Sequence, residues 1–89
     1  MRKIINFIKK FFNYEKNEKL YYIEWNKRWT GAVQETFNIV LAKSKINALK
    51  ILVTKHGSDF YGRGPNLSNV RLATKEDLKE NQLPILKDG

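Results

Sequence analysis

The sequence predicts a small α+β domain, in which one helix covers a three-stranded sheet and an amphipathic N-terminal helix precedes it. Three observations predict this fold class. One stretch has apolar residues at helical spacing, two neighbouring stretches have apolar residues at alternate positions, and a later stretch opens with a helix cap. The expected order of elements is helix, strand, strand, helix, strand and short helix, or α-β-β-α-β-(short α).

The first helix is expected over residues 2–14, the clearest periodic segment of the chain. Its apolar residues fall on one side of a helical wheel, and its basic residues and asparagines fall on the other. The apolar side consists of Ile4, Ile5, Phe7, Ile8, Phe11, Phe12 and Tyr14. We expect this side to pack on the sheet face that the other helix leaves bare. Two alternatives stay open, because such a helix also suits the interface of an anionic membrane or a groove in a partner protein.

Two strands are expected over residues 20–29 and 35–42, joined by a hairpin loop over residues 30–34. Alternate residues from Tyr21 to Trp25 are apolar, and the second segment alternates in the same way. A strand with this pattern buries one face. We therefore expect Trp25 in the core.

The second helix is expected over residues 45–56. Ser44 is a suitable N-cap, and Gly57 suits the left-handed position after the last turn. The helical wheel has a broad apolar arc that includes Leu49, which we expect in the core. A short third strand follows over residues 70–73. A right-handed crossover through the helix would make the second and third strands parallel, in a sheet whose strand order stays open.

A short helix is expected over residues 75–81, with Thr74 as its cap and Asp77 in its first turn. Pro84 then ends regular structure, and the last residues should fray. We interpret the chain as one domain over residues 1–89, made of an amphipathic basic helix (1–14), an α+β core (20–83) and a tail (84–89).

The residue content excludes several kinds of enzyme and metal site. The chain has no cysteine and one histidine, so it cannot form a disulfide framework, a zinc finger or a multi-histidine site. His56, Ser58 and Asp59 are the side-chain types of a hydrolytic triad, but triad members are usually brought together from distant segments. The carboxylates are not paired on a predicted buried face. We therefore predict a protein that is not an enzyme, with no catalytic residue, metal or cofactor.

Gly62 and Gly64 flank Arg63 in a segment of loop-forming residues. A nucleotide-binding fingerprint would need a third glycine, a preceding strand and a following helix, which this segment lacks. We interpret it as a surface loop. Glycine allows close backbone approach to a phosphate, and Arg63 offers a planar group to bind it.

The charge favours an anionic partner. There are 17 Lys and Arg residues against 9 Asp and Glu, a formal net charge of +8 on 89 residues, and the excess lies in residues 1–73. Lysine, asparagine and isoleucine are frequent, as in AT-rich coding sequences. This usage suggests a phage or mobile-element accessory protein. It also weakens the charge argument, since mutational bias alone can supply lysines.

Cations and aromatic residues occur together in the hairpin and in later segments, a combination that binds single-stranded nucleic acid by contacting phosphates and stacking on bases. The candidate nucleic-acid-binding residues are Lys27, Arg28, Trp29, Tyr61, Arg63 and Arg71. In the alternative interpretation, Trp29 belongs to the core with Trp25, and the cations are ordinary solvated charges.

The predicted function is therefore a small basic binding module that associates with nucleic acid through phosphate contacts and with little sequence selectivity. Two alternatives are a module that inhibits or modulates a larger protein, and a peripheral membrane protein anchored by residues 2–14. The sequence contains neither an apolar run long enough to span a bilayer nor a signal-peptide pattern, so we expect a cytoplasmic protein. It predicts no oligomeric state.

Overall fold

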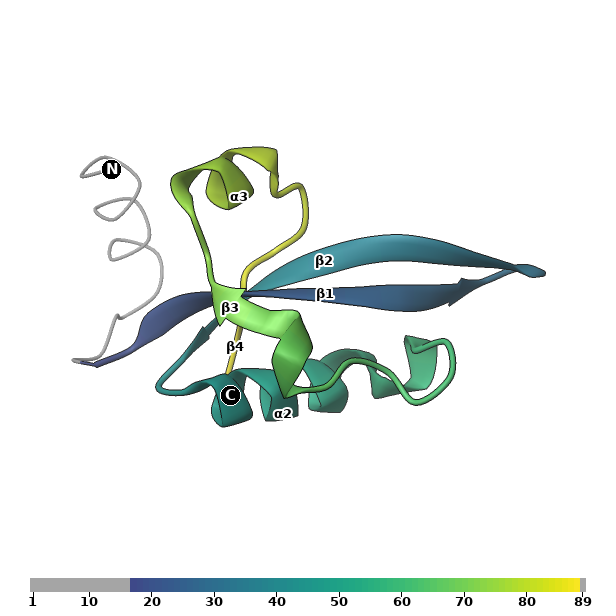
Figure 1. Cartoon of the computed structure of the whole chain (residues 1–89), viewed down its shortest axis with the longest axis horizontal. Coiled ribbons are helices and arrows are strands. Elements are labelled where there is room, and N and C mark those ends of the chain that lie inside the picture. The colour runs from purple at the N-terminus through teal and green to yellow at the C-terminus, as the bar shows by residue number, and fades with distance from the viewer. Residues whose placement is uncertain (1–16, 89) are drawn as a thin grey trace.

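The structure is a computed structural model that describes residues 17–88 (Figure 1). Its centre is a four-stranded mixed sheet with the strand order β3-β1-β2-β4. The two long strands pair antiparallel, β3 pairs antiparallel with β1, and β4 pairs parallel with β2. The strands are β1 (Lys19–Trp29), β2 (Ala32–Ala42), β3 (Val70–Leu72) and β4 (Leu86–Lys87).

The β1–β2 hairpin is the longest feature of the sheet. Its register runs from the pair Lys19 and Ala42 to the pair Trp29 and Ala32, so only Thr30 and Gly31 form the loop. Gly31 has φ 69°, a left-handed conformation that glycine adopts without strain. The predicted five-residue loop is therefore wrong, because one glycine at the second loop position lets pairing continue to the end of the hairpin.

The helix α2 (Lys45–His56) covers one face of the sheet (Figure 1). Its start follows the predicted cap, since the Ser44 hydroxyl accepts a hydrogen bond from the Asn47 N–H at 3.1 Å. Gly57 does not take the predicted left-handed conformation. It has φ −55° and ψ −35°, and the chain continues into the short 3-10 helix η1 (Gly57–Asp59).

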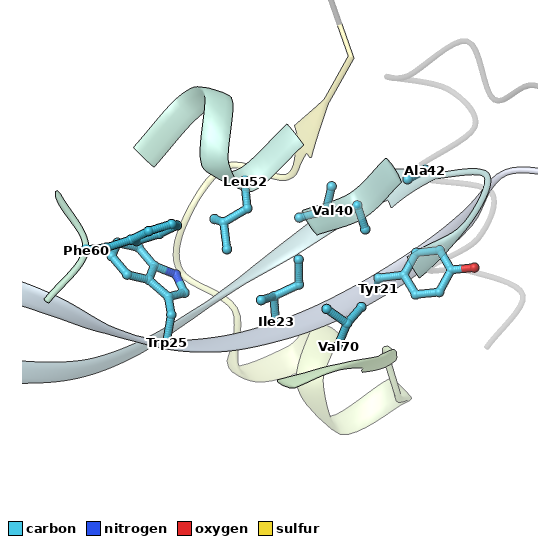
Figure 2. Close-up of a cluster of buried hydrophobic side chains, with 9 residues drawn as sticks. Tyr21, Ile23, Trp25, Val40, Ala42, Leu52, Phe60 and Val70 are labelled. Atoms are coloured by element: carbon cyan, nitrogen blue, oxygen red, sulfur yellow. The ribbon is translucent and has the colours of Figure 1, made fainter. Parts of the chain in front are cut away.

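The main core lies between α2 and the sheet, and Figure 2 shows its side chains pointing toward one another. Ala48 and Leu52 of α2 are buried there, and Leu49 is partly buried against them. Alternate residues of β1 face the helix, as the sequence pattern predicts. The buried sheet and loop residues of this core are Tyr21, Ile23, Trp25, Val40, Ala42, Phe60 and Val70.

The second helix of the described part, α3 (Lys75–Glu80), lies on the other side of the sheet from α2 (Figure 1). It begins with a capping box. The Thr74 hydroxyl accepts a hydrogen bond from the Asp77 N–H at 3.2 Å, and the Asp77 carboxylate accepts one from the Thr74 N–H at 2.7 Å. A second 3-10 helix, η2 (Leu67–Asn69), leads into β3.

The predicted three-stranded sheet is wrong, because β4 adds a fourth strand within the segment interpreted as a tail. Val40 pairs with Leu86, and Leu41 pairs with Lys87. A two-residue strand has no alternation to recognise, and its pairing comes from the position of the chain after α3. The predicted helix over residues 2–14 lies outside the described residues.

A crossover helix most simply connects two parallel strands that are neighbours in the sheet, and α2 does not do so. The second and third strands run in the same direction, but β1 lies between them, so α2 connects strands that are not neighbours. The edge strands β3 and β4 pair only with the half of the hairpin that is farther from its loop. Arg71 on β3 pairs across the sheet with Tyr22, near the opposite end of β1 from the hairpin loop.

Candidate functional site

The far end of the β1–β2 hairpin extends beyond the sheet (Figure 1). The edge strands reach only part of the hairpin, since β3 pairs with Tyr21–Ile23 and β4 pairs with Val40–Leu41. Every residue from 28 to 35 is exposed. The chain therefore presents a two-stranded ribbon end whose side chains are not needed to close the core.

The loop after η1 is attached to this ribbon by backbone and aromatic contacts. Lys27 and Phe60 form an isolated antiparallel bridge, and the Tyr61 N–H donates to the Asn26 carbonyl at 2.9 Å. Phe60 packs edge-on against Trp25, with ring centres 5.0 Å apart (Figure 2). Phe60 is buried, and the next residue, Tyr61, points outward with 56% of its surface exposed.

Gly64 folds the same loop back onto Phe60. It has φ 77°, and a Cβ atom at this position would lie 2.3 Å from Cδ2 of the Phe60 ring. Gly62 has φ 69° but open space around it. The glycine pair therefore shapes and packs a loop that carries Arg63 at its exposed turn, in agreement with the interpretation as a surface loop.

A groove of about 350 Å³ lies between the hairpin end and this loop. Three of its lining side chains are apolar or aromatic and well exposed: Trp29 at 57%, Tyr61 at 56% and Val33 at 46%. The Lys27 ammonium lies 5.7 Å from the centre of the Trp29 ring, within the range of a cation–π contact. The groove is lined by Arg28, Trp29, Gly31, Ala32, Val33 and Tyr61. We call this feature the hairpin groove.

The structure brings together most of the predicted candidate residues. Arg28, Trp29 and Tyr61 line the hairpin groove, Lys27 lies beside Trp29, and Arg63 is in the loop that follows Tyr61. Trp29 does not share the core with Trp25, which is 5% exposed. Trp29 lies in the exposed end of the hairpin, beyond the part of β1 that the core residues cover. Ala32 and Val33 also line the groove but are not among the predicted candidates, because the sequence pattern places them in a loop.

Arg71 lies elsewhere, because β3 places it beside Tyr22. Its guanidinium lies 3.9 Å from the centre of the Tyr22 ring and donates two hydrogen bonds to Asp77, at 2.6 and 3.1 Å. The hydrogen bond to Asp77 raises the pKa of Arg71, and the same bond holds the pKa of Asp77 below its usual value. Arg71 therefore attaches α3 to the sheet.

The triad-like residues form a local contact. Nδ1 of His56 lies 3.3 Å from Oδ2 of Asp59, three positions later, and the imidazole ring lies 5.6 Å from the Trp25 ring centre. This geometry closes the turn after α2. Within residues 17–88, no group of three or more His, Asp and Glu side chains could hold a metal ion. In the same residues, no helix has the length and hydropathy needed to cross a membrane.

A larger hollow, of about 880 Å³, lies beside α2 and β4. Its described lining includes the lysines of positions 43, 50, 55 and 87 together with Glu18 and Asp88, and it contains no aromatic side chain. Both acids lie among the lysines. The hairpin groove is the only one of the two hollows whose described lining combines cations with exposed rings.

Comparisons of the chain with protein-family models, with curated proteins and with solved structures each found no match.

Proposed function

We propose that this protein is a non-enzymatic nucleic-acid-binding module that contacts phosphates with the end of its β1–β2 hairpin and the loop after Phe60. One observation carries the proposal: segments far apart in the sequence place Arg28, Trp29 and Tyr61 around one exposed groove. Aromatic surface next to flexible cations is how proteins bind the nucleic-acid backbone and bases together.

The charge around the hairpin groove supports phosphate contact. Arg28 lines the groove, the Lys27 ammonium lies 5.7 Å from the Trp29 ring centre, and Arg63 follows Tyr61 by two positions. The whole chain has a formal net charge of +8. Arg63 is exposed on a glycine-flanked turn, so its guanidinium can meet a phosphate without losing a core contact. Contacts to phosphates carry little sequence information, so we expect weak sequence selectivity.

The apolar part of the groove favours a second candidate, a partner protein. Exposed aromatic side chains such as Trp29 and Tyr61 are frequent at the centres of protein interfaces. The two candidates differ in their response to salt. Phosphate binding releases counterions and weakens steeply with salt, whereas an association dominated by apolar burial does not.

The test is fluorescence anisotropy of a labelled 20-nucleotide strand at several salt concentrations. We expect log affinity to fall linearly with log salt, and Arg28→Ala/Arg63→Ala to reduce the slope by about 1.4, since each phosphate contact on a single strand contributes about 0.7. The control is Lys75→Ala/Lys79→Ala, which removes the same charge from exposed positions of α3. It should leave the slope nearly unchanged.

Two results would contradict the proposal. Affinity that does not change with salt would exclude phosphate contacts and favour the protein partner. Equal loss of slope in both double variants would show that binding depends on net charge alone and not on the hairpin end.

A further inference from the structure

We infer that the hairpin groove receives an unpaired nucleobase, so that the protein binds single-stranded nucleic acid in preference to duplex. This inference rests on the proposed function and adds the form of the ligand to it. It depends on how the two exposed rings are presented, on the size of the groove and on the position of the cations.

Trp29 presents an uncovered ring for a reason visible in the sheet register. It pairs with Ala32, the last pair before the loop, and a methyl group opposite an indole leaves most of the ring in solvent. Tyr61 is likewise more than half exposed. Neither ring belongs to the main core, so both remain available to a ligand.

The backbone that carries Tyr61 is held in place by contacts within the chain. The Tyr61 N–H donates a hydrogen bond to the Asn26 carbonyl, and the neighbouring Phe60 is buried against Trp25. Gly64 closes the loop over the Phe60 ring. A loop backbone held in this way loses little conformational freedom when a flat ring stacks on Tyr61, which favours binding.

The hairpin groove is small and has exposed rings in its lining. Its volume is about 350 Å³, and Trp29 and Tyr61 are both more than half exposed. In a duplex both faces of each base are covered by neighbouring pairs. Only an unpaired base can offer its face to Trp29 or Tyr61, and any base can do so, because each has a π face.

Three cations lie close to the two exposed rings in the sequence. Arg28 lines the groove beside Trp29, and the Lys27 ammonium lies 5.7 Å from the Trp29 ring centre. Arg63 follows Tyr61 by two positions and is exposed in the same loop. Each ring therefore has a cation within two residues of it, which allows stacking and phosphate contact in the same strand.

The test compares three labelled ligands of equal strand length at one salt concentration. They are a single-stranded thymidine oligonucleotide, a strand of abasic sites with the same phosphates, and a duplex. We expect the thymidine strand to bind at least about tenfold more tightly than the abasic strand, and more tightly than the duplex. Trp29→Ala/Tyr61→Ala should remove the difference between the thymidine and abasic strands, and Trp29→Phe/Tyr61→Phe should retain most of it.

The outcomes separate the two proposals. Equal binding of the thymidine and abasic strands, or tighter binding of the duplex, overturns the base-stacking inference and leaves phosphate binding in place. Binding of none of the three ligands overturns both. Circular dichroism and a urea unfolding curve for each variant show that it is folded, as we expect for substitutions at exposed positions.

Discussion

The guanidinium group of Arg71 is bound by both carboxylate oxygens of Asp77, at 2.6 and 3.1 Å. This contact joins β3 to the first turn of α3. Asp77 also accepts a hydrogen bond from the Thr74 N–H, so one carboxylate caps the helix and pairs with the sheet. The guanidinium also lies 3.9 Å from the centre of the Tyr22 ring, which stacks on Phe37 with ring centres 4.8 Å apart. Arg71, which the sequence predicts as a nucleic-acid-binding residue, therefore connects β3 to α3 and to β1.

The pKa of Asp77 predicts a loss of stability in acid. The hydrogen bond from Arg71 holds this pKa below 3.8, the ordinary value that the unfolded chain would have. The stabilisation is therefore complete above about pH 4 and is lost as pH falls through the lower folded pKa. Urea unfolding between pH 2 and pH 7 should show a flatter acid limb for Asp77→Asn than for the parent protein. Parallel acid limbs would show that Asp77 has the same pKa in the folded and unfolded chain.

Arg71 should matter for stability and not for binding. Arg71→Ala removes two charge-assisted hydrogen bonds and leaves the Asp77 carboxylate without its cationic partner, so the midpoint of urea unfolding should fall. Arg71→Lys keeps the charge but cannot form the same planar pair, and we expect an intermediate midpoint. The salt slope of oligonucleotide binding should be unchanged in both variants. A reduced slope would place Arg71 in the binding surface.

The two loop glycines should respond differently to substitution. Both have positive φ, so an alanine costs about 1 to 2 kcal/mol of backbone strain at either position. At Gly64 the new methyl group would also collide with the Phe60 ring, which adds about 1 to 3 kcal/mol. Gly64→Ala should therefore lower the free energy of unfolding by roughly 2 to 5 kcal/mol, more than Gly62→Ala. Equal losses in a urea titration would contradict the close packing of Gly64.

Adjacent residues of α2 provide a matched test of the core. Leu52 is fully buried, and Val53 is 48% exposed. Leu52→Ala should cost about 2 to 5 kcal/mol because it leaves a cavity, whereas Val53→Ala should cost far less. Thermal unfolding followed by circular dichroism measures both. A larger effect at Val53 would mean that α2 is rotated relative to the sheet.

The burial of Leu49 shows what a helical wheel can and cannot predict. The wheel places Leu49 toward the core, and the structure finds it partly buried, while the full burial falls on Ala48 and Leu52. Periodicity identifies the side of a helix that faces the protein. Which residues of that side become fully buried depends on the sheet that packs against the helix, and a helical wheel carries no information about the sheet.

The candidate site divides in the same way. Trp29, Arg28 and Lys27 are neighbours in the sequence, so their proximity on one ribbon end follows from the hairpin alone. The addition of Tyr61 depends on the bridge between Lys27 and Phe60, a pairing between distant segments. The separation of Arg71 from this group depends on which strand lies beside β1. Nothing in the local sequence around position 71 indicates its partner Asp77.

The sequence by itself determined the presence of the two hairpin strands, the buried face of β1, and the N-caps of α2 and α3. These features depend on neighbours within a few positions, through alternation, helical spacing and a hydroxyl next to free N–H groups. Tertiary structure alone decided the fourth strand, the place of β3 beside β1, the packing of Gly64 on Phe60 and the structural role of Arg71. A strand of two or three residues, or a single ion pair, has too weak a local sequence preference to specify its partner. The packing of the longer elements determines which partner lies within reach.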